Sequence, residues 1–383
     1  MIVAGEPSGD AHAAALVEAL RAQNSEGDLS FFGATGPLMR ANSVESIVQS
    51  DDLSIVGLLE IGRALPKFWQ AFKALKQAAL ERKPHAVIFV DWPDFNLRLA
   101  RALHRRGFKT IYYISPQLWA WRSHRARAIK RDVDLLLAIL PFETGWYAGR
   151  GVPQVEFVGH PLAGEVRARY GREEFCRMHN LDPGRPIIAL LPGSRLQELE
   201  RILPPMLKSA EVVASQRGDV QFVLVIAPNR TTVEAERILT STDNGSRLME
   251  FRLVHHETRE ALAACDVAAI ASGTATLEAA LLSTPMVIVY KESTINWHIL
   301  GRLITAEHYG LVNLIAGRRV VTELMQNDLN GPDLARELIR LLDTERNAAV
   351  RRQLREITAQ LGDGGATQRA AARILNALKA WRN

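Results

Sequence analysis

The chain has 383 residues, of which 47% are hydrophobic and 23% charged, and its formal net charge is +5. This length suits two domains of ordinary size, each with a core of its own. No uncharged run reaches the ~20 residues that cross a bilayer, so a membrane-spanning protein is excluded. The first residues lack the basic and apolar segments of a signal peptide, which predicts a cytoplasmic protein. Cys176 and Cys265 are far apart, so neither a disulfide nor a zinc site is indicated.

Short apolar runs alternate with helical patterns, which predicts parallel sheets built from β-α-β units. In the first half the expected strands are Met1–Ala4, Leu29–Gly33, Ala86–Val90, Thr110–Ile114, Leu135–Leu140 and Val155–Val158. In the second half they are Ile187–Leu191, Gln221–Ile226, Phe251–Val254, Val267–Ile270 and Met286–Val289. We therefore expect an α/β protein with two Rossmann-like domains that face a cleft.

The expected domains are residues 1–165 and 166–360, joined by a segment within Gly159–Pro186 that mixes glycine, proline and charge. The part from Gly331 onward has the pattern of two or three amphipathic helices, with a break at Gly362–Gly365 before Ala366. Residues 361–383 are expected to form a helix that can pack back on the first domain.

Each half opens with the same motif, a buried strand that runs into a glycine turn and a helix start. Met1–Ala4 leads into Gly5–Asp10, and Ile187–Leu191 leads into Pro192–Arg195. Such a turn exposes backbone N–H groups and the positive end of a helix. Because Arg195 stands beside the second turn, a phosphate-bearing ligand is expected there.

The segment after Val267–Ile270 has the same character. Ser272, Gly273 and Thr274 let the backbone approach a ligand, and their N–H groups can receive a diphosphate. Glu278 lies about one and a half turns into the following helix, from which its carboxylate can reach a ribose diol. The alternative is an ordinary solvated carboxylate on a helix.

A carboxylate directly follows the expected strand Ala86–Val90. Ligands bind beyond the carboxyl ends of parallel strands, and the apolar run before Asp91 partly removes this side chain from water. A carboxylate in that position has a raised pKa and can accept a proton from a substrate hydroxyl. Asp91 is therefore the expected general base, with helix capping as the alternative. Asp94 is expected to cap the next helix.

Polar and aromatic groups follow the expected strand Thr110–Ile114. They can hydrogen-bond a sugar and cover its ring face. The residues concerned are Ser115, Gln117, Trp119 and Arg122. From Arg98 to Arg131 there are ten Lys or Arg residues and no Asp or Glu. Such a stretch favours phosphates, anionic lipid or nucleic acid, with solvated helix faces as the alternative.

One helical pattern combines large apolar residues with a basic flank. The apolar positions are Leu58, Ile61, Leu65, Phe68, Trp69, Phe72 and Leu75. By itself this spacing favours a core-facing helix. Its lysines and its Trp also suit a membrane-surface or acyl-chain contact through Phe68, Trp69 and Phe72.

Several familiar site classes lack their motifs. There is no G-x-G-x-x-G after a strand and no G-x-x-x-x-G-K-[ST], which argues against dinucleotide oxidoreductases and P-loop proteins. Gly193-Ser194-Arg195 is not the G-x-S-x-G of a hydrolase. The histidines have no metal-ligand spacing.

Seven motifs, in this order and over nearly the whole chain, resemble the lipid-A-disaccharide synthase family. They are Ala4–Asp10, Asp91–Asn96, Ser115–Arg122, Leu140–Glu143, Val158–Pro161, Leu191–Arg195 and Ala271–Glu278. One departure is Thr35, which stands where a glycine is usual. Each motif alone is weakly specific, whereas the combination is highly specific.

The resemblance implies a GT-B glycosyltransferase at the cytoplasmic face of the inner membrane of a Gram-negative bacterium. It would join UDP-2,3-diacylglucosamine to 2,3-diacylglucosamine 1-phosphate through a β-1,6 bond and release UDP. No metal, no cofactor and no nucleic acid partner is expected, and a homodimer stays open. Carried over by motif, Asp91 would be the general base, Arg195 a UDP-phosphate contact and Glu278 the ribose-binding acid. Further substrate contacts would be Ser8, Asp10, Asn96 and Asn313.

Two alternatives stay open from the sequence. An enzyme like UDP-N-acetylglucosamine 2-epimerase would share the architecture and the UDP site but would need no acyl-binding surface. A non-catalytic RNA-binding module could use the basic stretch together with stacking groups. Those groups would be Tyr112, Tyr113, Trp119 and Trp121.

Overall fold

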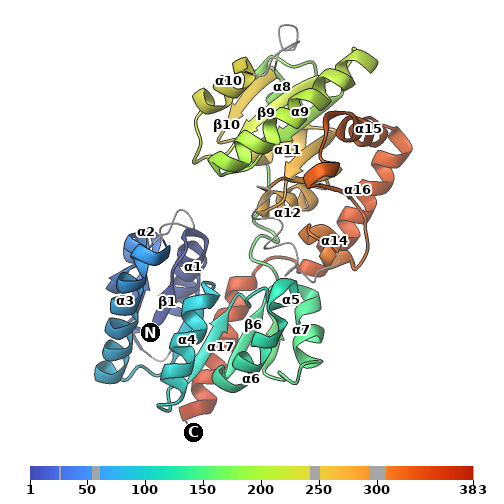
Figure 1. Cartoon of the computed structure of the whole chain (residues 1–383). Helices are drawn as coiled ribbons and strands as arrows, with labels where there is room; N and C mark the ends of the chain where they lie inside the picture. The colour runs from blue at the N-terminus through green and yellow to red at the C-terminus, as the bar shows by residue number, and fades with distance from the viewer. Residues whose placement is uncertain (26, 54–60, 242–250, 293–307, 383) are drawn as a thin grey trace. The chain divides into compact units, whose positions relative to one another are not determined.

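The computed structural model describes residues 1–25, 27–53, 61–241, 251–292 and 308–382. The chain divides into two compact units (Figure 1). Unit 1 comprises Met1–Ala163 and Leu361–Asn383, and unit 2 comprises Gly164–Gln360. The change of unit after Ala163 lies two residues before the expected boundary at 165/166. The C-terminal helix belongs to unit 1.

The described part of unit 1 forms a parallel sheet of seven strands in the order β3-β2-β1-β4-β5-β6-β7. Its strands are β1 (Ile2–Ala4), β2 (Phe32–Thr35), β3 (Glu45–Gln49), β4 (Val87–Val90), β5 (Thr110–Tyr113), β6 (Leu135–Ala138) and β7 (Val155–Phe157). The parallel α/β class and six of these strands confirm the sequence prediction. β2 begins at Phe32 instead of Leu29, because Leu29 and Phe31 pack into the core before the strand starts.

Strand β3 was not expected from the sequence. It lies at the edge of the sheet, where it pairs only with β2. Its residues Glu45–Gln49 are exposed or half-buried and include a charged and an amide side chain. Edge strands often carry such polar residues and have no continuous apolar run. The apolar pattern that identified the central strands is therefore missing here.

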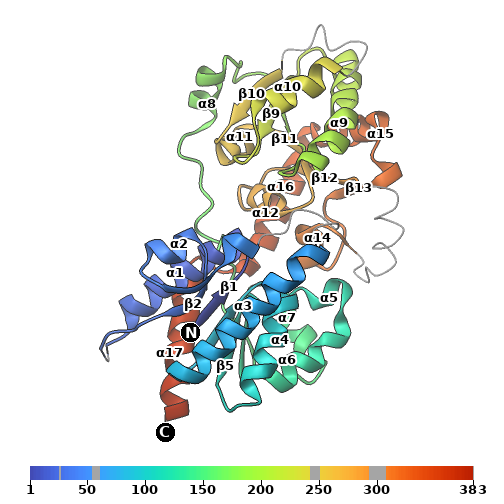
Figure 2. The same ribbon diagram turned by 60° about the vertical axis from the view of Figure 1, so that its left-hand side comes forward.

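Helices cover both faces of the first sheet (Figures 1 and 2). Their bounds are α1 (Pro7–Gln23), α2 (Pro37–Ala41), α3 (Ile61–Arg82), α4 (Pro93–His104), α5 (Leu118–Trp121), α6 (Ala126–Asp132), α7 (Pro141–Ala148) and α17 (Ala366–Arg382). On one face, apolar residues of α3, α4 and α6 pack against alternate strand residues such as Phe89 and Tyr112. On the other, α1 and α17 pack against Ile88 and Tyr113.

Helix α17 returns from the far end of the sequence to the first sheet. Ala370, Ala371 and Ile374 are buried in the same core cluster as residues of α1. The side chain of Gln23 in α1 also donates to the carbonyl of Gln368, at 3.0 Å. The helix begins at Ala366, directly after the expected glycine break.

The described part of unit 2 forms a parallel sheet of six strands in the order β10-β9-β8-β11-β12-β13. They are β8 (Ile187–Leu191), β9 (Gln221–Ile226), β10 (Phe251–His255), β11 (Val267–Ala271), β12 (Met286–Tyr290) and β13 (Thr322–Met325). Five of them confirm the prediction to within one residue at either end. Their continuous apolar runs are typical of parallel strands that are buried on both faces.

Strand β13 was missed because a glutamate lies in its middle. Glu323 is buried, and its carboxylate accepts hydrogen bonds from the backbone N–H groups of Tyr309 and Gly310 at 3.1 and 2.9 Å. A charged residue that is satisfied by distant backbone groups gives no strand signal in the sequence.

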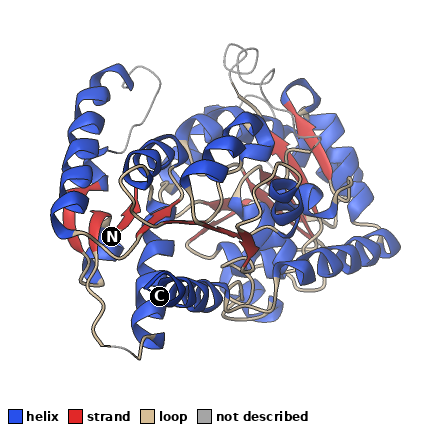
Figure 3. Cartoon of the chain, turned by 90° about the horizontal axis from the view of Figure 1, so that it is seen from below, coloured by secondary structure: helices blue, strands red, loops and turns tan. Residues whose placement is uncertain are grey.

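The helices of unit 2 are α8 (Arg172–His179), α9 (Leu196–Gln216), α10 (Thr232–Ser241), α11 (Thr258–Ala264), α12 (Thr274–Leu281), α14 (Leu311–Ala316), α15 (Gly331–Leu341) and α16 (Thr344–Thr358). Helix α15 packs against α9, and α16 packs against α12. In Figure 3 the strands lie between helices. Together, α15, α16 and α17 confirm the amphipathic helices expected after Gly331. Among helices within the described residues, none is both long and apolar enough to cross a membrane.

Candidate functional site

Asp91 lies at the carboxyl end of β4, in a constrained backbone segment. Both Asp91 and Trp92 have φ of 51°, a left-handed conformation that non-glycine residues rarely adopt. Two buried side chains hold this backbone segment. The hydroxyl of Tyr112 and the amide of Asn96 donate hydrogen bonds to the carbonyl of Asp91, at 2.6 and 2.7 Å. Strained backbone of this kind persists where the surroundings fix it, and it clusters at functional sites.

The carboxyl group of Asp91 is half-buried. Burial raises its pKa, and a hydrogen bond from the backbone of Trp92 only partly offsets this. The structure therefore gives Asp91 the environment that the sequence predicted for a general base. Tyr112 and Asn96 thus fix the backbone of Asp91, and substrate contact by the buried Asn96 stays a prediction.

The aromatic ring of Trp92 fills the space beside the first glycine turn. A Cβ atom on Gly5 would lie 2.0 Å from this ring, so only glycine fits at that position. The Trp92 ring also stacks with the ring of Phe95, and the two ring centroids are 4.1 Å apart. Phe68 and Phe72 of α3 extend this aromatic cluster. The cluster thus ties α3 to the residue next to Asp91.

The segment after β5 is fixed by a buried glutamate, Glu143, from the segment after β6. Ser115 Oγ and Trp119 Nε1 both donate to Glu143 Oε1, at 2.5 and 3.1 Å. The backbone N–H groups of Ile139 and Leu140 donate to the other carboxylate oxygen, at 3.2 and 3.0 Å. The two predicted sugar contacts Ser115 and Trp119 are therefore buried and hold their own loop, whereas Gln117 is exposed.

Burial raises the pKa of Glu143 to about 6, although four donors oppose this shift. Glu143 was not expected from the sequence to be part of the site. The sequence does contain a signal for a helix start at this position. A proline at 141 and an acidic residue two positions later, Glu143, are typical of the first turn of a helix. What the sequence could not show was that Ser115 and Trp119 share this carboxylate.

Replacing Glu143 by Gln is expected to lower the free energy of unfolding by about 1–3 kcal/mol, because the new amide N–H group faces donors and leaves buried groups unpaired. The pH dependence changes as well. The raised pKa contributes stability that is complete below the ordinary pKa of 4.5 and is lost as the pH rises through about 6. In Glu143→Gln, this decrease of the free energy of unfolding with rising pH is expected to disappear.

Denaturant unfolding of both proteins between pH 4 and 7 measures the two effects. Glu18→Gln, on the exposed face of α1, is the matched control. Equal stability and an unchanged slope in Glu143→Gln would contradict this assignment.

The remaining predicted contacts of unit 1 lie at or near the same carboxyl edge. Ser8 is exposed in the first turn of α1. Asp10 is buried, and its carboxylate accepts three backbone N–H bonds from Gly36, Leu38 and Met39 at 2.8–3.1 Å. It thereby caps α2. Substrate contact by Ser8 and Asp10 stays a prediction.

The expectation that Asp94 caps α4 is wrong. The residue before this helix is Trp92, and Asp94 lies inside the first turn without a capping hydrogen bond. Pro93 starts the helix earlier than expected, since proline suits the first helical position. The carboxylate of Asp94 instead binds the guanidinium groups of Arg122 and Arg125.

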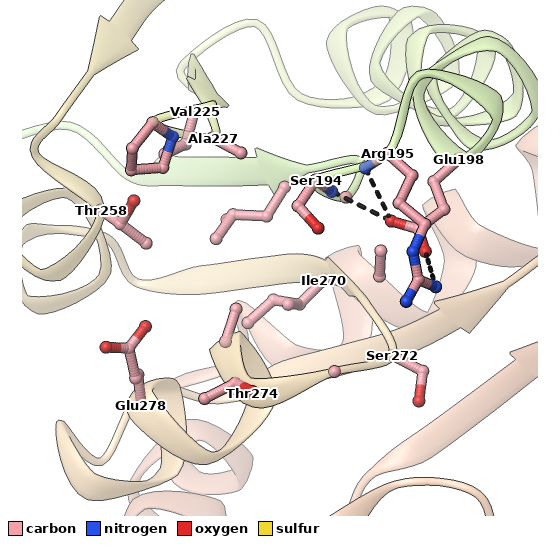
Figure 4. Close-up of a pocket in the computed structure, with 16 residues that line it drawn as sticks. Ser194, Arg195, Glu198, Val225, Ala227, Thr258, Ile270, Ser272, Thr274 and Glu278 are labelled. Atoms are coloured by element: carbon pink, nitrogen blue, oxygen red, sulfur yellow. Dashed lines mark hydrogen bonds and ion pairs between the residues drawn. The ribbon is translucent and has the colours of Figure 1, made fainter. Parts of the chain in front are cut away.

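Unit 2 contains an open pocket of about 360 Å³ at the carboxyl edge of its sheet (Figure 4). All seven residues predicted to bind UDP line it: Gly193, Ser194, Arg195, Ser272, Gly273, Thr274 and Glu278. The other lining residues include apolar side chains of the strand ends, such as Val225 and Ile270. Residues from β8, β9 and β11 thus converge on one cavity, as expected for a ligand site in an open α/β sheet.

The first glycine turn of this pocket opens helix α9. Gly193 has φ of +116°, and a Cβ there would lie 2.5 Å from the carboxylate of Glu198. That carboxylate accepts hydrogen bonds from the N–H groups of Ser194 and Arg195 at 3.0 and 3.1 Å, and from the Arg195 side chain at 3.1 Å (Figure 4). The donors that would suit a phosphate are therefore already arranged around an anion. Glu198 was not identified from the sequence.

The second turn, Ser272–Thr274, lies at the start of α12 and exposes Gly273 and Thr274 to the pocket. Glu278 points into the pocket away from Arg195 and Glu198 (Figure 4). Its carboxylate is held by Arg259 of α11, at 3.0 Å between Nε and Oε1. One part of the pocket therefore carries a fixed carboxylate, and the other carries a cation and helix-start amides.

Asn313, in α14, is fully buried. Its amide donates to the carbonyl of Val321 and to Glu323, at 2.9 and 2.8 Å. Its oxygen accepts from the N–H groups of Val320 and Val321 at 2.7 and 3.0 Å. Asn313 thus connects α14 to β13, and its predicted role as a substrate contact stays a prediction.

The burial of the proposed stacking groups contradicts the RNA-binding alternative. Tyr112 and Tyr113 are completely buried, and Trp119 is nearly so. Only Trp121 of the four proposed stacking groups is exposed. A base cannot stack on a ring that the sheet and its helices already cover.

The fold is similar to solved structures that bind UDP. UDP-GlcNAc 2-epimerase from Neisseria meningitidis bound to UDP-GlcNAc has a TM-score of 0.61 and 12% identity, covering 96% of this chain and 97% of its own. HepE from Anabaena in complex with UDP and glucose has a TM-score of 0.59 and 13% identity, covering 98% of each chain. At this identity the likeness concerns the fold. Two parallel-sheet α/β units, the second with a pocket at the carboxyl edge of its sheet, define a protein of the GT-B fold class.

Sequence comparison gives the family. The model of the lipid-A-disaccharide synthetase family matches residues 1–376. Lipid-A-disaccharide synthase of Geobacter sulfurreducens is 41% identical over 380 residues, which is 99% of this chain and 97% of the relative. The enzyme of Anaeromyxobacter dehalogenans is 42% identical over 381 residues, with the same two coverages. The chain therefore belongs to the lipid-A-disaccharide synthase family of glycosyltransferases.

Proposed function

We propose that this chain transfers diacylglucosamine from UDP-2,3-diacylglucosamine to the 6-hydroxyl of 2,3-diacylglucosamine 1-phosphate, with inversion. The products are the β-1,6-linked tetraacyl disaccharide 1-phosphate and UDP. The observation that carries the assignment is that all seven residues expected to bind UDP line one pocket of unit 2. Family membership supplies the identity of the two lipid substrates.

In this reaction Asp91 accepts the proton of the acceptor 6-hydroxyl. The oxygen of that hydroxyl bonds to the anomeric carbon of the donor sugar while the bond from this carbon to the UDP oxygen breaks. The electron pair of the broken bond leaves with the diphosphate. Because positive charge develops at the anomeric carbon and negative charge on the leaving group, the reaction needs a base and a set of donors for the diphosphate.

The pocket of unit 2 offers donors for the leaving diphosphate, so the diphosphate does not need to take up a proton as it leaves. Ser194, Arg195 and Thr274 line the pocket, and we expect the Arg195 side chain and the N–H groups of Ser194 and Thr274 to contact the diphosphate, because helix starts favour anions. The backbone donors of the first turn now bind Glu198, so the diphosphate has to share or displace that carboxylate. Glu278, held by Arg259, would accept hydrogen bonds from the ribose hydroxyls.

The direct test is to supply the purified protein with both diacylated glucosamine substrates and to measure UDP and the tetraacyl disaccharide phosphate. Both products are expected in equal amounts. The second candidate, a 2-epimerase, would instead exchange the C2 proton of UDP-N-acetylhexosamine with solvent and would release no disaccharide. Exchange without disaccharide formation would overturn the synthase assignment.

We further propose that helix α3 contacts the membrane surface or the acyl chains. Leu65 and Trp69, one turn apart, are 60% and 58% exposed. Lys73 lies over the Trp69 ring, with Nζ 4.8 Å from the ring centroid, and Lys67 is also exposed. An exposed Trp and Leu beside lysines suit an anionic lipid interface. Phe68 and Phe72, also expected there, pack instead toward the core against Phe95.

Replacing Leu65 and Trp69 together by Ser is expected to weaken binding to phosphatidylglycerol vesicles by roughly tenfold or more, since each apolar side chain that leaves water contributes about 1.5–3 kcal/mol. Co-sedimentation measures the binding, and circular dichroism checks the fold. Val233→Ser, which changes an exposed apolar residue of unit 2, is the control. Unchanged vesicle binding would remove α3 from the proposed contact.

A further inference from the structure

Two arginines in unit 1 share one carboxylate oxygen near the proposed base. The guanidinium groups of Arg122 and Arg125 each donate to Asp94 Oδ1, both at 2.6 Å. The two arginine side chains are only 30% and 25% exposed, whereas the Asp94 side chain is 58% exposed. The cations are thus anchored in the protein, and the anion that they hold faces the solvent.

Further contacts fix Arg122 in place. Its guanidinium carbon lies 3.9 Å from the centroid of the Trp121 ring, a distance that suits a cation–π contact. Trp121 itself is 39% exposed, so an aromatic face accompanies the two cations at the surface. The backbone N–H of Arg122 also donates to the carbonyl of Leu118, which anchors it to the loop that Glu143 holds.

The charges of this cluster do not balance. Two guanidinium groups and one carboxylate leave one net positive charge, in a stretch from Arg98 to Arg131 that contains ten Lys or Arg residues and no acid. Elsewhere in this stretch Lys109 and Arg131 have carboxylate partners of their own, Asp134 and Asp132. Burial raises the pKa of Asp94, but Arg125 and Arg122 more than offset this and lower it below the ordinary value. Asp94 is therefore an anion held by an excess of cations.

The cluster lies at the same edge of the sheet as the proposed base. Asp94 is three residues after Asp91, in the first turn of α4, and both arginines follow β5, which pairs with β4. A helix start adds further positive potential there. On the acceptor sugar, the ring oxygen joins C1, which bears the phosphate, to C5, which bears the hydroxymethyl group with the 6-hydroxyl, so the two groups lie within one pyranose ring of each other. A base and a phosphate site at one sheet edge match this arrangement.

We propose that Arg122 and Arg125 form the binding site for the 1-phosphate of the acceptor, and that Asp94 is the counter-ion that the phosphate displaces from the two arginines. This inference rests on the proposed function. A phosphate monoester carries a charge of about −1.5 to −2 at pH 7 and accepts several hydrogen bonds, so it neutralises two guanidinium groups better than one carboxylate does. Arginine is suited to this role because its planar fork binds phosphate through two parallel N–H bonds.

The test compares two acceptors, one with the 1-phosphate and one with a 1-hydroxyl. For Arg125→Gln and Arg122→Gln, we expect kcat/KM to fall by about 10- to 100-fold with the phosphorylated acceptor and far less with the hydroxyl acceptor. Arg127→Gln, an exposed arginine two residues from Arg125, is the matched control and should behave as the wild type. An equal loss with both acceptors, or no loss with either, would overturn the proposal.

A second measurement does not depend on turnover. Calorimetry with 2,3-diacylglucosamine 1-phosphate is expected to show weaker binding to both variants by a similar factor, and unchanged binding to Arg127→Gln. Absence of product from the wild type would refute the proposed function, whereas calorimetry would still test the phosphate site. In Asp94→Asn, which removes the competing charge, binding of this ligand should tighten. Weaker binding would contradict the role given to Asp94.

Phospholipid headgroups also carry phosphate, and vesicles distinguish them from the acceptor. The two arginine variants should bind phosphatidylglycerol vesicles as the wild type does. If they lose vesicle binding while the ratio of the two acceptor activities stays unchanged, the arginines bind headgroups and the acceptor-phosphate proposal is wrong.

Discussion

Asp91→Asn is expected to lower kcat by about 10²- to 10⁴-fold, the usual range for removing a general base. The amide has the shape of the carboxyl group but cannot accept the proton of the acceptor hydroxyl. The backbone of this residue should be unaffected, because the bonds from Tyr112 and Asn96 go to its carbonyl. UDP affinity should stay unchanged, since the proposed UDP pocket lies in unit 2. Steady-state kinetics and UDP calorimetry measure the two quantities.

The pH profile gives a second readout. The base works only when it is ionised, and burial raises the pKa of Asp91 above its ordinary value of 3.8. In the wild type, kcat/KM should therefore decline as the pH falls through this raised pKa, and the decline should be missing from the residual activity of Asp91→Asn. Asp28→Asn, an exposed aspartate of the same unit, is the control. Near-normal turnover of Asp91→Asn would refute the base assignment.

Arg195→Ala is expected to weaken UDP binding and raise the KM for the donor by about 10- to 100-fold, because a hydrogen bond to a charged group contributes roughly 1.5–3 kcal/mol. The Arg195 side chain is 81% exposed and is held by Glu198, so its loss should leave the fold intact. Calorimetry with UDP separates this binding effect from any change in chemistry.

Arg217 provides the matched control because it lies at the opposite end of the same helix, α9, where it pairs with Asp219. Arg217→Ala should retain full UDP affinity. If Arg195→Ala bound UDP as tightly as the wild type, the phosphate contact would have to come from other groups of the pocket.

Local patterns in the sequence predicted the sheets and the ligand turns well. β8 coincides with its apolar run, and β9 contains the apolar run Phe222–Ile226 after one polar residue, because a strand buried on both faces needs an unbroken apolar segment. The turns at Gly193 and Gly273 were visible because a strand, a small residue and a helix start follow each other directly. Since parallel strands end at one edge, these turns were expected to meet, and they line one pocket.

Side-chain roles were predicted less well, because a residue type does not reveal its partner. Asp10 and Asn313 were expected to contact the substrate, and their polar atoms also bind backbone groups, which lie 26–29 residues away from Asp10 and seven or eight residues away from Asn313. Trp69 and Phe72 are three residues apart in one helical pattern, but one is exposed while the other packs against Phe95. Only packing against a neighbouring helix decides which side of such a pattern is covered.

By itself, the sequence determined the α/β class, the order of the central strands along the chain, the glycine turns and the family. The strands and the glycine turns depend on residues that are close together in the chain, and the family depends on a set of short motifs, each of which is local. Only the tertiary structure decided that Glu143 holds the Ser115–Trp119 loop and that Asp94 binds two arginines. A buried or shared charge needs a counter-charge or hydrogen-bond donors, and the fold brings these partners from distant parts of the chain. No local sequence pattern therefore predicts which residues they are.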